Sequence, residues 1–275
     1  VATACSVICW SLFFLLLDKW KRQWHLILFA VLAPLSAFLV FLWPLAVDPI
    51  FNKFAPLEQG SLRTKIEALA AKSGIADATI LVADKSRQTK QLNAYVTGIG
   101  SSARIVLFDT IIAKMPEDEL LTIVGHEIGH YVLLHIYKGY ACSMLALLIG
   151  LLVAQRWAPW LLAKLPQRWG VNSLHDLTLI PLVLLVSAPA HLIFAPVESS
   201  ISRMFEHEAD SYALAATNAP TSLANAFITL AQKDLINPQP PEWIEFWFFS
   251  HPALGRRIDF AMSHRRPALP APVAD

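Results

Sequence analysis

Long apolar stretches without charged residues constrain the fold of this chain more than any other feature of its sequence. Four segments contain no Asp, Glu, Lys or Arg: residues 2–17, 26–47, 139–155 and 177–197. Each approaches the roughly 20 residues that an α-helix needs to cross a bilayer. Because 55% of the chain is hydrophobic and only 16% is charged, the pattern predicts a mainly α-helical, polytopic membrane protein in contact with the lipid bilayer.

The start of the chain argues against a signal peptide, and its net charge argues against nucleic-acid binding. Val1 opens directly in apolar sequence, with no basic segment before it and no small-residue cleavage site after it, so we expect no signal peptide. We expect instead a fragment of a longer protein that lacks upstream spans. The net charge of +1 gives no basic surface for nucleic acid, and the three cysteines lie in apolar stretches without C-x-x-C spacing.

A histidine motif between the second and third spans carries the strongest chemical signal. His126 and His130 lie four residues apart in a helical pattern, so both imidazoles project from one helical face. This spacing is typical of two ligands that share one tetrahedral zinc ion. Glu127 projects beside that face, where a carboxylate can act as general base toward a water molecule that the metal activates. The motif alone leaves open an amphipathic helix with histidines on its surface.

A catalytic zinc ion needs a third protein ligand and one open position. His135 is close in sequence, but on a continuous helix it would lie about 140° around from His130 and point away from the pair. Residues 202–210 are the better source, because Glu206 and Asp210 lie one helical turn apart on one face. Glu206 could then bind the metal while Asp210 accepts a hydrogen bond from a ligating histidine.

Two neighbours of Glu206 offer alternatives. Glu208 should face elsewhere, because it lies about 200° around the helix from Glu206. His207 is a competing ligand, although it lacks an equivalent partner one turn further on. An acidic helix face exposed to solvent is the non-functional alternative for the whole segment.

The polar region 48–136 should combine helices with a small sheet. Its pattern predicts an amphipathic helix at residues 61–73, closed by Gly74, and three short strands at residues 79–82, 93–97 and 104–108. Pro116 should open the helix that carries the histidine motif, and that helix should continue through Leu134 almost into the third span. The third and fourth spans should form a hairpin, which returns the later ligand segment to the side of the histidines.

Five ordered motifs together resemble the type I CAAX prenyl proteases, which are integral-membrane zinc metalloproteases of the gluzincin kind. The motifs are DPIFNKF at 48–54, LNAYVTG at 92–98 with RIVLFDT at 104–110, the histidine motif, the segment 202–210, and SHPALGRRI at 250–258. The resemblance implies a gluzincin-like zinc-protease core (α+β) within the membrane protein. It also implies seven spans around a chamber, of which four are visible here.

The resemblance assigns roles to individual residues. His126, His130 and Glu206 match the ligands of one zinc ion per chain, Glu127 the general base, and Asp210 the carboxylate behind a ligand. His251 matches a catalytic histidine that contacts the substrate carbonyl and the developing oxyanion. The substrate-binding candidates are Asn93 and Ala94, on an edge strand that holds the substrate backbone, and Arg257, which could equally form a structural ion pair.

The predicted organisation follows from these motifs. It comprises two N-terminal spans (1–47), a catalytic region (48–136), a transmembrane hairpin (137–197), a second catalytic segment (198–264) and a disordered tail (265–275). The predicted activity is zinc-dependent endoproteolysis of a peptide or protein substrate, by resemblance a prenylated CAAX tail. A heat-shock-type membrane quality-control protease and a non-enzymatic zinc-binding scaffold are the alternatives. The resemblance places the catalytic side in the cytosol, whereas basic residues in the opposite loops favour the reverse orientation.

Overall fold

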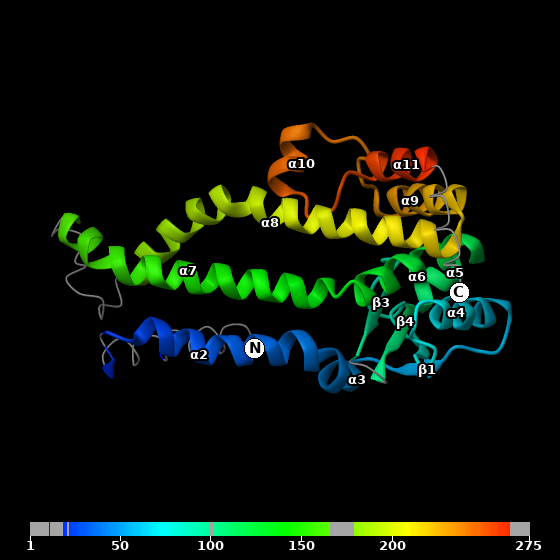
Figure 1. The fold of residues 1–275 in the computed structure, drawn as a ribbon, viewed down its shortest axis with the longest axis horizontal. Coiled ribbons are helices and arrows are strands. Elements are labelled where there is room, and N and C mark those ends of the chain that lie inside the picture. The colour runs from blue at the N-terminus through cyan, green and yellow to red at the C-terminus, as the bar shows by residue number, and fades with distance from the viewer. Residues whose placement is uncertain (1–10, 12–18, 21, 99–101, 166–178, 265–275) are drawn as a thin grey trace, which may run out of the picture. The chain divides into compact units, whose positions relative to one another are not determined.

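The computed structural model describes residues 11, 19–20, 22–98, 102–165 and 179–264 (Figure 1). The chain separates into two compact units, which are described one at a time. The first contains Val1–Val40 and Tyr137–Phe194, and the second contains Phe41–Ile136 and Ala195–Asp275. The predicted first span (2–17) and the predicted disordered tail (265–275) lie outside the described residues, apart from the single position 11.

The first unit is built from long apolar helices. It contains α2 (Trp24–Ala37), the start of the π-helical segment η1 (Phe38–Val47), most of α7 (His135–Lys164) and the first half of α8 (Leu179–Thr217). The Tyr140 hydroxyl of α7 donates a hydrogen bond to the Ala33 carbonyl of α2 at 2.6 Å. Trp24–Pro44 and His135–Lys164 are long and apolar enough to cross a membrane. They correspond to the predicted second and third spans.

Apolar side chains on these two helices remain uncovered within the unit. None of the most apolar stretch of either candidate span is buried. Exposed apolar surface on this scale is typical of a helix that faces lipid. The predicted fourth span (177–197) coincides with the first half of α8 and stays a prediction, because part of it lies outside the described residues.

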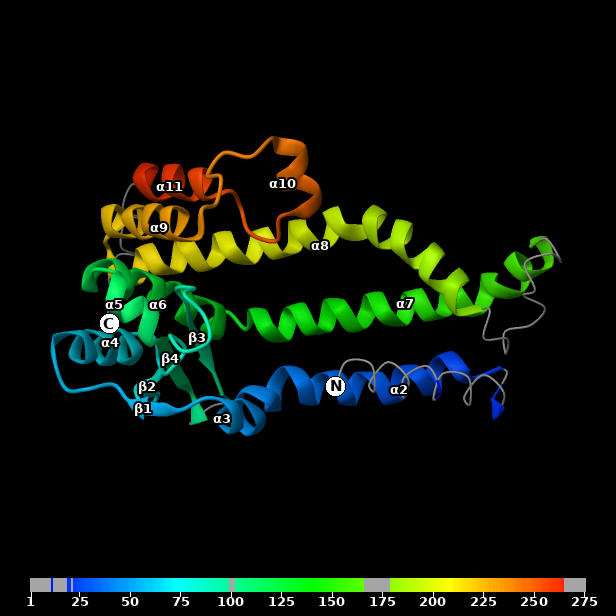
Figure 2. The same cartoon turned by 180° about the vertical axis from the view of Figure 1, so that it is seen from behind.

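The second unit combines short helices with a small sheet. Its elements in chain order are α3 (Asp48–Phe51), β1 (Phe54–Pro56), α4 (Ser61–Lys72), β2 (Thr79–Ala83), β3 (Ala94–Thr97), β4 (Arg104–Phe108), α5 (Asp109–Lys114), α6 (Glu117–Val132), α9 (Pro220–Asp234), α10 (Glu242–Phe248) and α11 (Leu254–Ser263), together with the second half of α8. Figure 2 shows the sheet from behind, with α4 and α6 beside it.

The sheet confirms the three predicted strands and adds a fourth. The order is β1-β2-β4-β3, with β2 parallel to β4 and the other two pairs antiparallel. Strand β1 was not predicted because it is only three residues long and ends in proline. Strand β3 lies at an edge of the described sheet, next to α6. The predicted helix at 61–73 is confirmed as α4, and Gly74 closes it with a φ of 77°.

The end of the motif helix differs from the prediction. Helix α6 begins after Pro116, as expected, but it ends at Val132 instead of continuing through Leu134. Leu134 adopts a left-handed conformation with a φ of 58°, which an L-amino acid other than glycine or asparagine rarely adopts. The chain therefore changes direction between α6 and α7, and His135 is the first residue of a new helix.

Candidate metal centre

A close crossing of α6 and α8 brings the two predicted ligand segments together. A side chain at Gly129 would begin 3.0 Å from the Cβ of Tyr212 and 3.3 Å from the Cα of Ala209. One turn earlier, Gly125 faces Ala213 at 3.5 Å. Glycines and alanines at four-residue spacing thus let the helix backbones approach closely. The sequence contained this signal as two matching small-residue pairs, but we had not predicted its role.

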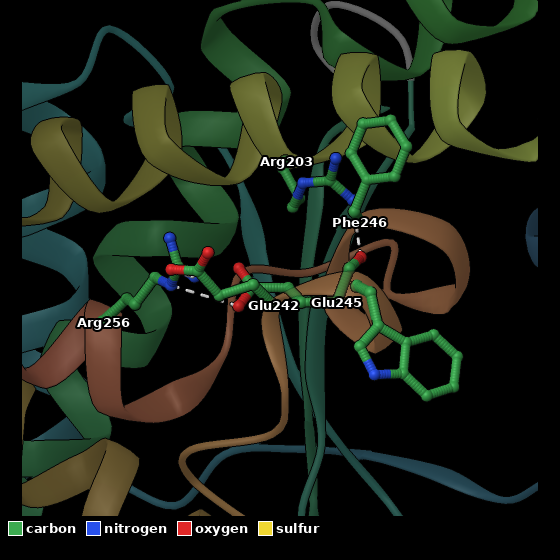
Figure 3. A pocket seen from close by; sticks show the side chains of 6 residues that line it. Arg203, Glu242, Glu245, Phe246 and Arg256 are labelled. Atoms are coloured by element: carbon green, nitrogen blue, oxygen red, sulfur yellow. Dashed lines mark hydrogen bonds and ion pairs between the residues drawn. The ribbon is translucent and has the colours of Figure 1, made fainter.

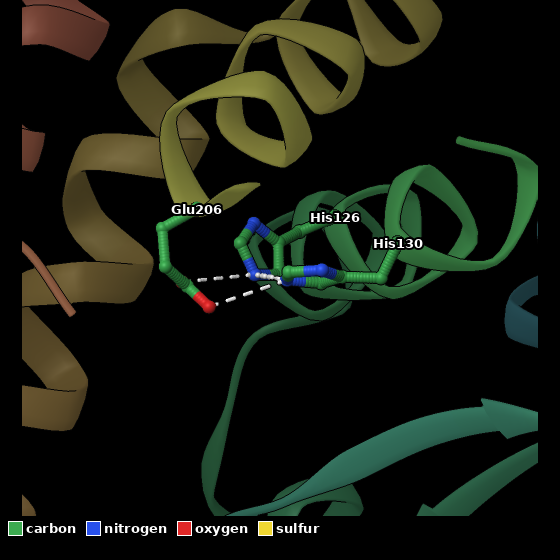
Figure 4. A group of neighbouring side chains, drawn as sticks. All are labelled: His126, His130 and Glu206. Atoms are coloured by element: carbon green, nitrogen blue, oxygen red, sulfur yellow. Dashed lines mark hydrogen bonds and ion pairs between the residues drawn. The ribbon is translucent and has the colours of Figure 1, made fainter. Parts of the chain in front are cut away.

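The crossing places His126 and His130 of α6 against Glu206 of α8 (Figure 4). His126 Nε2 lies 3.0 Å from His130 Nε2 and 3.4 Å from Glu206 Oε2, and His130 Nε2 lies 3.3 Å from Glu206 Oε1. Two atoms that each lie about 2.0–2.1 Å from a tetrahedral zinc ion are about 3.3 Å apart. All three separations are close to that value.

The carboxylate of Glu206 supports the same conclusion. Its Oε2 atom is buried and has no hydrogen-bond partner among the described residues, although three side-chain nitrogens lie within 3.4 Å. Native proteins seldom leave a buried polar atom without a partner. The three side chains therefore fit a single metal ion that takes up this oxygen and the two imidazole nitrogens.

His126 is held from behind by a buried ion pair. Its Nδ1 atom lies 2.8 Å from Asp210 Oδ1. Arg257 of α11 donates two hydrogen bonds to the same carboxylate, Nε to Oδ2 at 2.8 Å and Nη2 to Oδ1 at 2.7 Å. The Arg257 guanidinium also lies over the Phe227 ring, 4.2 Å from its centroid. Asp210 thus accepts the hydrogen bond that we predicted for it, and Arg257 forms the ion pair that was its alternative role.

Charge and burial set the ionisation of these groups. Burial lowers the pKa of His126, but its contacts with the carboxylates of Asp210 and Glu206 outweigh burial and raise the pKa to about 9. Burial alone would raise the pKa of Glu206, yet the contacts with His126, His130 and His251 hold that pKa well below its ordinary value. Glu206 is therefore a charged carboxylate, which is the form that a metal binds.

Glu127 differs from the other acids of the site. It is half-buried on α6, and burial raises its pKa above the ordinary value. Electrostatic interaction with His126 and His130 offsets part of that effect. A carboxylate with a raised pKa is better matched to accepting a proton near neutral pH than an ordinary glutamate is.

The loop between α10 and α11 brings His251 to the cluster. Its Nδ1 atom lies 2.9 Å from Glu206 Oε2, while its side chain is 62% exposed. Arg203 of α8 fastens this part of the chain, because its Nη1 donates to the carbonyls of Glu245 at 3.0 Å and Phe249 at 2.8 Å. His251 therefore has one ring nitrogen at the cluster and the other toward the open side.

A cavity of about 420 Å³ lies beside this attachment (Figure 3). Three of its charged side chains form ion pairs: Arg256 Nε lies 3.1 Å from Glu245 Oε2, and Arg256 Nη2 lies 3.4 Å from Glu242 Oε1. Trp243 and Phe246 form the apolar part of the wall. None of the three metal-binding candidates lines this cavity, so it is separate from the metal cluster.

The other histidines near the motif are arranged differently from our expectation. His135 does not point away from the pair, because the turn at Leu134 brings its Nδ1 to 2.9 Å from His130 Nδ1. Glu208, which was expected to have no part in the site, lies 2.9 Å from His135 Nε2. His207 faces Phe260 of α11, with ring centroids 4.4 Å apart, and does not join the cluster.

The predicted substrate strand has a free edge beside α6. The Phe108 backbone N–H donates to the Asn93 carbonyl at 3.0 Å, so the backbone of Asn93 faces β4. Because neighbouring residues of a strand alternate, the backbone groups of Ala94 and Val96 face the open edge. Among the residues that the structure describes, the Ala94 N–H is met there by the side chain of Asn93, at 2.9 Å.

Several known proteins are similar to this chain in sequence and in fold. The model of peptidase family M48 matches residues 56–265. A Bacillus subtilis protein named "Uncharacterized metalloprotease YhfN" is 34% identical over 254 residues, which cover 92% of this chain and 60% of that relative. CAAX prenyl protease 1 of Saccharomyces cerevisiae is 30% identical, over 90% of this chain and 57% of its own length.

The fold of a solved structure agrees with these sequence matches. The crystal structure of S. mikatae Ste24p superposes with a TM-score of 0.79 at 27% identity, and the match covers 96% of this chain and 64% of that one. This chain thus spans less than two thirds of each of these relatives. The family match covers most of the chain and includes all three metal-binding candidates. The chain belongs to peptidase family M48.

Proposed function

We propose that this chain is the catalytic part of a multi-pass, membrane-embedded zinc metalloendopeptidase. The observation that carries the proposal is the cluster of His126, His130 and Glu206, which fits one metal ion and has Glu127 on the same turn of α6. Three protein ligands leave one coordination position open, as a catalytic zinc requires. A purely structural site would normally be closed by a fourth protein ligand.

Each residue of the site has a separate role in the proposed hydrolysis of a peptide bond. A zinc ion in the cluster would polarise the scissile carbonyl and make water a better nucleophile. Glu127 accepts a proton from the attacking water and passes it to the amine as the carbon–nitrogen bond breaks. His251 can donate a hydrogen bond from its outward nitrogen to the developing oxyanion. Ala94 and Val96 hold the substrate backbone as an added strand.

The proposed substrates are C-terminal CAAX tails of prenylated proteins. This proposal is supported by the similarity to CAAX prenyl protease 1 of Saccharomyces cerevisiae, Oryza sativa and other organisms. We place the catalytic side in the cytosol, where such tails are found. The exposed apolar helices α2 and α7 support a location in the membrane.

Replacing Glu127 tests this function in the full protein. Glu127→Gln keeps the size of the side chain but cannot accept a proton, so we expect bound zinc near one per chain and a loss of turnover of at least about 10²–10⁴-fold. Metal analysis and cleavage of a quenched peptide give the two measurements. Loss of zinc together with turnover, or normal turnover, contradicts the role assigned to Glu127.

A pair of matched peptides tests the substrate. A farnesylated CAAX peptide should be cleaved with a higher kcat/KM than the same peptide without the prenyl group. Equal cleavage of the two, together with degradation of misfolded membrane proteins, would favour a quality-control protease. No cleavage of any peptide by the zinc-loaded protein would favour a non-enzymatic scaffold.

A further inference from the structure

Through His135, the second histidine of the cluster is connected to a carboxylate. The Nδ1 atom of His135 lies 2.9 Å from His130 Nδ1, and its Nε2 atom lies 2.9 Å from Glu208 Oε2. The residue is 4% exposed, and its ring stacks on Phe205 with centroids 4.6 Å apart. His135 is therefore fixed in orientation between the end of α6 and the middle of α8.

The backbone before His135 is shaped to make this contact. A continuous helix would carry His135 away from His130, as the spacing of five residues indicates. Instead α6 ends at Val132, and Leu134 adopts the left-handed conformation that redirects the chain. A leucine seldom adopts this conformation without compensating contacts. The contacts of His135 with His130 and Phe205 are such contacts.

The geometry permits one arrangement of protons. His130 Nε2 faces His126 and Glu206, so it must be unprotonated when a metal binds there. The neutral His130 ring then carries its proton on Nδ1 and donates it to His135 Nδ1. The proton of His135 consequently lies on Nε2, where Glu208 accepts the hydrogen bond. Both contacts are satisfied at once, and neither ring needs a charge.

We propose that His135 and Glu208 form a positioning relay that orients His130 and selects its metal-binding tautomer. The inference rests on the zinc site of the proposed function and goes beyond it, because neither His135 nor Glu208 belongs to the group that could hold the metal. Without His135, the His130 ring can rotate, and the competing tautomer places a proton on the nitrogen that must bind the metal. Loss of such a partner typically lowers metal affinity about 10–100-fold.

Two substitutions of His135 separate positioning from packing. His135→Phe keeps an aromatic ring against Phe205 but removes the acceptor for His130. His135→Asn removes the ring but keeps an acceptor oxygen close to the position of Nδ1. We expect zinc affinity, measured by competition with a chromophoric chelator, to fall about 10–100-fold in His135→Phe and by less than about threefold in His135→Asn. A packing role predicts the reverse order.

Further variants extend and control the test. Glu208→Gln should lie within about threefold of the parent, because its amide oxygen still accepts from His135, and Glu208→Leu should weaken zinc binding by more. His207→Phe removes an imidazole from the same helix that does not reach the cluster, so its zinc affinity should be unchanged. The melting temperature of each metal-free variant shows whether it folds; the Asn and Gln variants keep the test interpretable if the Phe or Leu variant does not.

The outcomes distinguish the relay from the zinc site itself. If Glu206→Ala loses zinc while His135→Phe binds it as tightly as the parent, the relay is wrong and the zinc site stands. If Glu206→Ala keeps zinc, the proposed zinc site fails, and the relay fails with it. Equal losses in His135→Phe and His135→Asn also overturn the relay, because they show that the acceptor atom makes no difference.

Discussion

The two histidines of the metal cluster are supported in different ways. Behind His126 lies Asp210, which is 1% exposed and receives two hydrogen bonds from the buried Arg257. Behind His130 lies the ring of His135, which leads to Glu208, whose side chain is 41% exposed. His126 thus contacts a buried ion pair, whereas His130 contacts an imidazole whose carboxylate partner is exposed to solvent.

The two supports should also differ in how much they contribute to the stability of the fold. Asp210 and Arg257 connect α8 to α11 as well as to His126 of α6, so they join three helices of the second unit. Removing one partner of a buried ion pair typically costs about 3–5 kcal/mol, because it leaves an uncompensated charge. His135 likewise joins three helices, α6, α7 and α8, but its carboxylate partner Glu208 is exposed, and an exposed carboxylate contributes little to stability. We expect both supports to serve metal binding, and the first to contribute more to folding than the second.

The largest expected effect comes from removing Glu206, the third candidate ligand, which contacts both supported histidines. Glu206→Ala deletes the carboxylate shared by the two histidines, so zinc stoichiometry should fall from one per chain to near zero, and cleavage with it. Glu198→Ala removes an exposed carboxylate from the same helix and should leave both unchanged. Metal analysis after exhaustive dialysis measures the outcome. A Glu206→Ala protein that retains zinc would show that the cluster is not the metal site.

The next largest effect should come from removing Asp210, the charged group behind His126. Asp210→Ala removes the carboxylate that accepts both hydrogen bonds of Arg257, so we expect about a 10–100-fold loss of zinc affinity and also a lower melting temperature of the metal-free protein. His135→Phe should match only the first of these losses. Chelator competition and thermal melting without metal measure the two quantities. If both variants lower the melting temperature equally, the two supports do not differ in the way we infer.

A third region should affect the substrate without affecting either support. Ala94→Pro removes a backbone N–H that faces the open edge of β3 and is not bonded to β4, so the fold and the zinc affinity should be retained. The kcat/KM for a peptide should fall by at least about tenfold, because a single backbone hydrogen bond contributes about 0.5–1.5 kcal/mol and the proline ring also obstructs the edge. Tyr95→Pro, on the alternate register that faces β4, should instead destabilise the protein. An unchanged kcat/KM for a folded, zinc-loaded Ala94→Pro variant would remove the added-strand model.

The sequence predicted those parts of the site that depend on spacing along one helix. The pairs His126 with His130 and Glu206 with Asp210 each lie four residues apart, and the structure places each pair on a common face as that spacing requires. Strand β3 was predicted from its β-rich sequence and flanking turn residues, whereas its position at an edge was implied only by the family resemblance. The fold of the second unit was thus predicted in its main elements, although the three-residue β1 was missed.

The parts that the sequence did not predict depend on backbone geometry and on contacts between helices. Leu134 carries no sequence signal for a left-handed conformation, so the contact of His135 with His130 could not be predicted from a continuous helical wheel. The ion pair of Arg257 with Asp210 required knowledge of how α11 packs, although it was one of two alternatives. Gly125 and Gly129 did carry a signal, since paired small residues mark a close helix crossing.

The smallest expected effect is the release of a proton from His126 when zinc binds, which depends on the carboxylates around this histidine. Because Asp210 and Glu206 raise the pKa of His126 to about 9, this histidine is largely protonated at pH 7 in the metal-free protein. Zinc can bind only the neutral ring, so binding at pH 7 should release about one proton from His126, and zinc affinity should rise with pH up to about 9.

The same shift affects the metal-free fold with a defined sign. A raised folded-state pKa contributes stability that is complete below the ordinary value of 6.5 and is lost as the pH rises through about 9. Calorimetric titration with zinc, in buffers of different ionisation enthalpy, measures the released proton. Asp210→Asn removes the negative charge behind His126 and should reduce the release, whereas His207→Phe should not. Zinc binding at pH 7 without proton release would mean that His126 is already neutral, and that the buried ion pair positions this ligand without charging it.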